Sequence, residues 1–184
     1  MIYIDRARVK LFLITFCLLY FILALPSLLP LQPNEVKMTV RGRNDERSAN
    51  ASVAFIFNNN LVVALTTLIP FVGWAWICYI MFNTGLVVAS YDNPMVCLWL
   101  NPFVYVELAI YSFVVVQSIR IFQLWRRRWT RFTDLDGKLV VRRTCGVYPE
   151  IIRVFAVTVI VVSLSLLLSA YAEIMYVQFL QSML

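Results

Sequence analysis

The stretch that decides the fold is residues 53–91, VAFIFNNNLVVALTTLIPFVGWAWICYIMFNTGLVVASY, which contains no charged side chain. A helix needs about 20 apolar residues to cross the hydrocarbon of a bilayer, so a run of this length holds two crossings. Its turn signal is the central PFVG at 70–73. The run therefore predicts a tight helical hairpin with helices at 53–70 and 73–91. A re-entrant pair that crosses only part of the membrane is the alternative.

The composition of the whole chain places it in lipid. Of its 184 residues, 61% are hydrophobic and 14% are charged, and the mean hydropathy is +0.79. A soluble domain of this size is nearer half apolar and a quarter charged, because a small globule cannot hide more apolar surface from water. The composition thus excludes a water-soluble globular enzyme and a disordered chain.

The N-terminal apolar run, 11–29, predicts a first membrane helix. Basic residues precede it, as in a signal peptide, but its apolar part is longer than the roughly 7–15 residues typical of a signal peptide. Residues 1–30 are therefore predicted to be an uncleaved anchor helix that ends at Pro26 and Pro30.

Two more apolar runs, 96–124 and 151–177, predict the fourth and fifth crossings. The fold class is thus an all-α integral membrane protein of about five transmembrane helices, forming a single membrane domain. Its predicted parts are the anchor 1–30, an extracytoplasmic loop 31–52, helices two to four in 53–124, a basic cytoplasmic loop 125–150 and a C-terminal helix 151–184.

The basic residues predict the orientation. Twelve of the 16 Lys and Arg lie on the side that holds the N-terminus and the 125–150 loop, and the other four lie in 31–52. Because cytoplasmic loops are enriched in Lys and Arg, the N-terminus is predicted inside and the C-terminus outside. Within the cytoplasmic loop, Asp136-Gly137 indicates a hairpin turn and 139–141 a small strand.

The residue types argue against several kinds of chemistry. The chain has no histidine, and its four cysteines form no close pair. Histidine-ligated haem, zinc or copper and Ser-His-Asp hydrolysis are therefore excluded. The five glycines form no phosphate-binding loop, which argues against ATP hydrolysis. We expect a non-enzymatic protein with no cofactor, no metal site and no catalytic residue.

Ionisable side chains within hydrocarbon are costly and are functional candidates by default. The predicted spans contain two, Glu107 and Glu173. Counted at about 1.5 Å per residue, Asn59, Asn60 and Asn83 fall with them in the outer half of the bilayer. We therefore predict one polar cluster built from four segments. Three interpretations stay open. The cluster could be a hydrogen-bonded network that stabilises the helix bundle, an outward-open cavity for a proton, cation or polar substrate, or a contact surface for a partner membrane protein.

Polar side chains on the fifth span recur at helical spacing and form one stripe: Thr158, Ser165, Ser169, Glu173 and Tyr176. Small hydroxyl residues let membrane helices approach closely. We expect the stripe to aim Glu173 at the bundle interior.

A basic cluster follows the fourth span: Arg126, Arg127, Arg128 and Arg131. Basic and aromatic residues at the inner membrane surface are typical of contact with anionic lipid headgroups, and we expect that contact here and not nucleic-acid binding. The expected partners are the lipid bilayer and either other membrane proteins or further copies of this chain.

Three motifs resemble those of the stage II sporulation protein M family. The stretch IFNNNLVVAL at 56–65, with the later PFVG and FNTG, resembles the family's paired Asn, a following Gly and an Asn-Gly-like element. PFVYVE at 102–107 keeps the Pro and Glu of a Pro-His-Gly-x-x-Glu-like element, but Phe and Val replace its His and Gly. LLLSAYAE at 166–173 resembles an apolar run followed by Ala-x-x-Glu.

This resemblance covers roughly residues 53–175 and implies a multi-pass protein of the cell (plasma) membrane. The best-known member sits in a membrane complex that organises peptidoglycan degradation during engulfment, and some relatives resemble accessory or permease-like components. The resemblance implies a scaffold, or an accessory or assembly subunit of a membrane complex. The alternative function is a small transporter or permease subunit that uses Glu107 and Glu173 as proton or cation sites.

Overall fold

A computed structural model of the chain describes residues 6–28, 38, 52–127, 129–133, 139–143 and 147–182. The helices are α1 (Arg6–Leu28), α3 (Val53–Thr67), α4 (Val72–Val88), α5 (Pro94–Leu100), α6 (Pro102–Arg127) and α7 (Val147–Ser182). The strands are β1 (Trp129–Thr133) and β2 (Leu139–Arg143). Apart from Met38 and Ser52, the predicted 31–52 loop lies outside the described residues.

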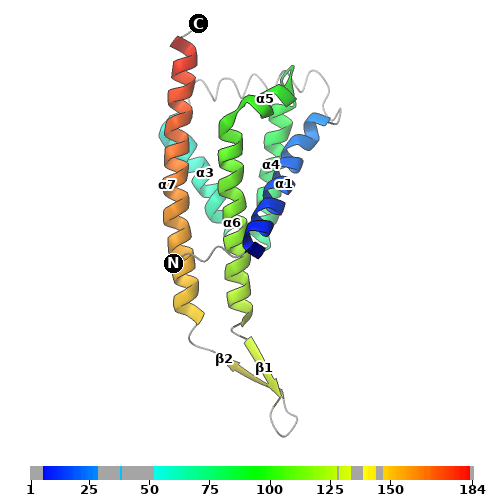
Figure 1. The fold of residues 1–184 in the computed structure, drawn as a ribbon, viewed down its shortest axis with the longest axis vertical. Helices are drawn as coiled ribbons and strands as arrows, with labels where there is room; N and C mark the ends of the chain where they lie inside the picture. The colour runs from blue at the N-terminus through cyan, green and yellow to red at the C-terminus, as the bar shows by residue number, and fades with distance from the viewer. Residues whose placement is uncertain are drawn as a thin grey trace.

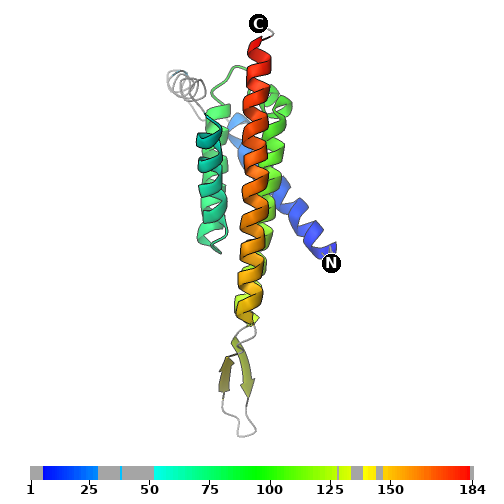
Figure 2. The same cartoon turned by 90° about the vertical axis from the view of Figure 1, so that its left-hand side faces the viewer.

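The apolar parts of the described chain are helical, so the predicted all-α membrane fold is confirmed at this level. Three helices, α1, α6 and α7, are long and apolar enough to cross a membrane, whereas α3 and α4 are shorter apolar helices. They form one bundle in which α6 packs against α1, α3 and α7 (Figure 1), while α4 packs against α1 and α3. Successive long helices alternate in direction, and the two strands project beyond the bundle from the ends of α6 and α7 (Figures 1 and 2).

The α3–α4 hairpin turns where PFVG predicts a turn. Ser52 caps the start of α3, because its Oγ accepts a hydrogen bond from the Phe55 backbone N at 3.2 Å. At the turn, Phe71 has a positive φ of 64°, a conformation that side chains disfavour. A Cβ at Gly73 would lie 2.4 Å from the Thr66 backbone O, so this close return of the chain requires glycine. Helix α3 begins at the predicted residue and ends three residues earlier, at the turn, whereas α4 begins one residue earlier and ends three residues earlier than predicted.

A buried hydrogen-bond relay anchors this turn to α6. The Trp74 indole Nε1 donates to Ser118 Oγ at 3.1 Å, and Ser118 Oγ donates to the Leu68 backbone O at 3.1 Å. The Phe71 ring meets the Phe122 ring edge-on, with 4.9 Å between centroids. The turn therefore lies beside the last third of α6, far along that helix from its start.

Helices α1 and α4 are in backbone contact at Gly85, where a Cβ would lie 2.2 Å from the Leu23 backbone O. The prediction that Pro26 ends the first helix is wrong, because α1 continues to Leu28 with Pro26 buried inside it. A proline in the last turn of a helix forfeits only its own backbone hydrogen bond. Here the Pro26 ring occupies the space beside the glycine.

The predicted fourth span, 96–124, is broken at Asn101 into α5 and α6. Asn101 is extended, with ψ 102°, and its Oδ1 accepts a hydrogen bond from the Phe103 backbone N at 3.0 Å. The prediction of one continuous helix is wrong here, because a residue before proline disfavours the helical conformation. Pro102 therefore starts a new helix, with Asn101 as its cap.

The predicted strand at 139–141 is confirmed as part of β2. It pairs antiparallel with β1, with Arg131 opposite Val141, and β1 was not predicted. The predicted turn at Asp136-Gly137 lies outside the described residues.

Ser118→Ala is expected to lower the free energy of unfolding by about 1–3 kcal/mol, because it leaves the Trp74 N–H and the Leu68 carbonyl without their partner. Ser112→Ala is the matched control: Ser112 is equally buried on α6, but its hydroxyl donates only to the Leu108 backbone O of its own helix. Thermal unfolding of the full chain in one detergent measures both. Equal losses in the two variants would contradict the anchoring role of Ser118.

Candidate functional site

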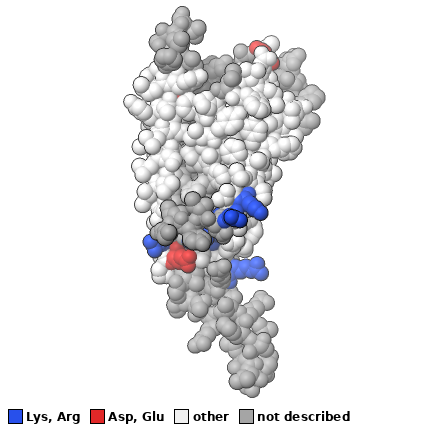
Figure 3. Space-filling model, in the orientation of Figure 1, with Lys and Arg blue, Asp and Glu red and all other residues white. Residues whose placement is uncertain are grey.

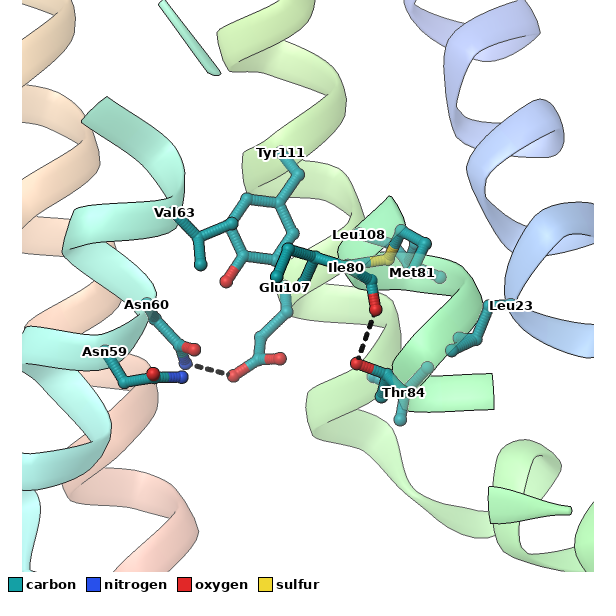
Figure 4. Close-up of a pocket in the computed structure, with 11 residues that line it drawn as sticks. Leu23, Asn59, Asn60, Val63, Ile80, Met81, Thr84, Glu107, Leu108 and Tyr111 are labelled. Atoms are coloured by element: carbon teal, nitrogen blue, oxygen red, sulfur yellow. Dashed lines mark hydrogen bonds between the residues drawn. The ribbon is translucent and has the colours of Figure 1, made fainter. Parts of the chain in front are cut away.

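A cavity of about 90 Å³ lies among α1, α3, α4 and α6 (Figure 4). Its polar lining comes from three of these helices: Asn59 and Asn60 from α3, Thr84 from α4, and Glu107 and Tyr111 from α6. The rest of the wall is apolar. The bundle therefore encloses a small group of amide, hydroxyl and carboxyl groups within aliphatic surroundings.

The central contact of this cavity joins α3 to α6. Asn60 Nδ2 donates a hydrogen bond to Glu107 Oε1 (Figure 4). Both side chains are half-buried. Hydrocarbon offers no water to satisfy polar groups, so an amide and a carboxyl at this depth must find partners within the protein. The contact links two segments 47 residues apart and brings together two of the side chains that the sequence predicted to share a depth.

Tyr111 stands one turn further along α6 and shares a face with Glu107, because the two are four residues apart. Its side chain is only 2% exposed, and its hydroxyl points toward the part of the cavity where Asn60 and Glu107 meet (Figure 4). That hydroxyl interacts electrostatically with the Glu107 carboxyl. Sequence analysis missed Tyr111, although the Glu-x-x-x-Tyr spacing that places it here is visible in the sequence.

On α4 the cavity meets Thr84 and not the predicted Asn83. Thr84 is exposed, and its Oγ1 donates to the Ile80 backbone O at 2.9 Å. Asn83 is half-buried, but the structure does not bring it to the cavity wall. Adjacent residues on a helix point about 100° apart, so an error of one position is enough to choose the wrong side chain.

Glu173 belongs to α7 and lies outside the cavity wall, but its carboxyl is close enough to Glu107 to interact with it electrostatically. The predicted polar stripe of α7 does turn inward at two of its positions, since Thr158 and Ser169 are buried. Near the end of the stripe, the Tyr176 ring meets Phe103 at the start of α6, with 5.7 Å between centroids.

Two carboxyl groups at this end of the bundle are therefore near enough for one to influence the other. Among the described residues, the Lys and Arg lie on α1 near its start, on α6 and the strands past Ser118, and on α7 near its start. Like charges in a low-dielectric site repel strongly, and a charge there needs a partner. The site is therefore suited to holding a proton or a cation.

The predicted headgroup arginines that the structure describes lie far from this cavity, beyond the opposite end of the bundle from the start of α6. Arg126 is exposed there, and Arg131 lies in β1. The side chains of Arg127 and Arg131 and the whole of Arg128 lie outside the described part. In that part, no group of three or more Cys, Asp and Glu is placed to hold a metal ion.

Comparison of the chain with protein-family models, with curated proteins and with solved structures found no match. The resemblance to the stage II sporulation protein M family therefore stays a prediction from motifs. Two positions that carry it, Asn60 and Glu107, are the pair that forms the central hydrogen bond.

Asn60→Ala is expected to lower the free energy of unfolding by about 1–3 kcal/mol, because it leaves the Glu107 carboxyl without its amide donor. The matched control is Asn58→Ala, which removes the same side chain from an exposed position on the same helix and should change stability by about 0.5 kcal/mol or less. Chemical or thermal unfolding in a single detergent measures both variants. A larger loss for Asn58→Ala would refute the proposed role of the Asn60 contact.

Proposed function

We propose that this chain is a multi-pass protein of the cell membrane that serves as a scaffold or assembly subunit of a membrane complex. The observation that carries the proposal is the exposed apolar face of α7. This helix has 36 residues, and it contacts α3 and α6 along one side only. Only 22% of an apolar 18-residue stretch of α7 is buried within the bundle, against 44% for the corresponding stretch of α6.

The exposed apolar side chains of α7 extend past the part of the helix that lipid tails would cover. The candidate span Tyr148–Tyr176 has 29 residues and includes Glu150, Arg153 and Glu173. At about 1.5 Å per residue its uncharged part, 154–172, is roughly 28 Å long, close to the hydrocarbon thickness of about 30 Å. Ile152 and Met175 lie beyond this part and are exposed. Large side chains such as Leu164 and Leu168 are also exposed within it. A helix of another membrane protein, or of a second copy of this chain, would cover the part that lipid tails do not reach.

We further propose five crossings, with the N-terminus inside. The α3–α4 turn contacts Phe122, just past Arg120, and Arg120 pairs with Glu150 of α7 at 3.5 Å. An ion pair between charged side chains is suited to a membrane boundary. The α3–α4 turn lies close to the level of this ion pair. The hairpin would therefore be long enough to reach this boundary from the opposite side of the membrane. On the face shown in Figure 3, the described basic side chains gather toward one end of the bundle below a broad uncharged band. Such an end is typically cytoplasmic, where Arg126 and its neighbours would meet anionic headgroups.

The orientation is tested with two variants of an otherwise cysteine-free chain. Thr130→Cys lies in β1 and Asp92→Cys in the α4–α5 loop, at opposite ends of the bundle. A membrane-impermeant maleimide added to intact cells is expected to label Asp92→Cys and to label Thr130→Cys only after permeabilisation. Labelling of Thr130→Cys in intact cells would reverse the proposed topology.

The scaffold role is tested on the exposed face of α7. The double variant Leu164→Ala and Leu168→Ala is expected to reduce the mass of the detergent-purified particle, because it removes apolar contacts to a partner helix. The matched control is Leu13→Ala and Leu18→Ala on α1, where both leucines are also exposed. Light scattering, with cross-linking in the native membrane, measures the assembly. A native particle with the mass of one 21.3 kDa chain, or equal losses in both double variants, would contradict the proposal.

A second function is favoured by the cavity itself. A small transporter or permease subunit with Glu107 and Glu173 as proton or cation sites would need carboxyl groups near each other and away from basic residues. The described residues at this end of the bundle meet that requirement. Flux across the membrane of a reconstituted vesicle distinguishes this function from a purely structural one.

A further inference from the structure

We propose that the cavity among α1, α3, α4 and α6 binds one small monovalent cation, with Glu107 as its counter-charge and oxygens of Asn60, Thr84 and Tyr111 as neutral ligands. This inference rests on the second function above, and it names the class of ligand. It is independent of the scaffold role of α7.

The hydrogen bonds around the cavity leave it rich in acceptors. Asn60 uses an amide N–H on Glu107, so its carbonyl oxygen stays free for another group. Thr84 donates its only hydroxyl proton to the Ile80 backbone O, so toward the cavity it offers lone pairs alone. The second oxygen of Glu107 adds a further acceptor. A cavity with this lining attracts a species that is positively charged or donates hydrogen bonds.

Tyr111 is an independent sign that a ligand belongs here. Its side chain is only 2% exposed, and its hydroxyl points into the cavity, with no hydrogen bond to the other lining residues drawn in Figure 4. A hydroxyl that faces a cavity in this way can bond to a water, an ion or a ligand there. A cation coordinated by Glu107 would also accept a lone pair from the Tyr111 oxygen.

The size and charge of the cavity limit the ligand to a small monovalent cation. Its volume of about 90 Å³ exceeds the roughly 10–15 Å³ of free space that one water needs, so it fits an alkali ion with a water or a protonated small amine. Glu107 is the one carboxylate in the described wall, since Glu173 stands outside it. Protein sites for divalent Ca²⁺ typically use several carboxylates.

The ligand has a route into the cavity from the surface. Asn59 of α3 and Thr84 of α4 both line the cavity and are both exposed. These two helices are joined at their other ends by the turn that Ser118 anchors. The cavity therefore opens between the free ends of the hairpin, close to the side of the membrane on which α6 starts.

The test is equilibrium binding of radiolabelled methylammonium and of radiolabelled Na⁺ to the full chain in detergent. We expect saturable binding of one cation per chain. Glu107→Gln should abolish it, because the amide keeps the shape and loses the counter-charge. Tyr111→Phe should weaken it about tenfold, the usual effect of one hydrogen bond to a charged group. The control Glu150→Gln removes a carboxylate at the opposite end of the bundle and should leave binding unchanged.

Absence of saturable binding by the native chain would overturn the inference, and so would unchanged binding in Glu107→Gln. If Glu107→Gln does not fold, unchanged binding in Tyr111→Phe overturns it instead. Competition experiments distinguish an alkali ion from a protonated amine as the bound cation. Displacement of methylammonium by Na⁺ or K⁺ indicates an alkali-ion site, whereas displacement by small amines alone indicates an amine site. Mg²⁺ that competes better than either would refute a monovalent site.

Flux measurements keep this inference separate from the second function. Cation binding without flux in proteoliposomes supports the site and refutes the transporter. Proton flux without cation binding refutes the site and supports a transporter that carries protons alone.

Discussion

The structure depends on one constraint: hydrocarbon supplies no hydrogen bonds, so the polar groups of the bundle are stabilised by partners on neighbouring helices. Three contacts between polar side chains of different elements lie at different levels. Asn60 donates to Glu107 near the start of α6, Trp74 and Ser118 tie the hairpin turn to its last third, and Arg120 pairs with Glu150 near the base of α7. Each contact joins different helices, so satisfying the polar groups also fixes how the helices are arranged.

The α3–α4 hairpin shows how this constraint creates a site. Its turn is held against α6 by Ser118, and Gly85 lets the far end of α4 press against the backbone of α1. The far end of α3 is instead drawn to α6 by Asn60. The cavity lies among the helices that these contacts join, with lining residues from α1, α3, α4 and α6. The contacts that hold the short helices in place thus also position the cavity wall.

The depth of the central polar pair followed from counting residues, because an α-helix rises by a constant amount per residue. Counting does not give the direction of a side chain around the helix. It therefore grouped Asn60 with Glu107 successfully, included Asn83 where Thr84 lines the wall, and overlooked Tyr111. The sequence did not indicate a role for Tyr111, because a tyrosine in an apolar run can lie either in a protein core or at a membrane surface. The break at Asn101 was readable from the following proline, whereas the close packing of Pro26 against Gly85 of α4 was visible only in the structure.

The sequence by itself determined that this chain has helices long and apolar enough to span a membrane, that its uncharged runs are helical, and where the hairpin turns. These properties follow from local composition and from the fixed rise of a helix. Only the tertiary structure decided which helices touch, that Asn60 meets Glu107 while Asn83 stands aside, and that a cavity with Tyr111 in its wall lies between them. Those outcomes depend on the rotation and packing of helices that are distant in sequence, which no local pattern encodes.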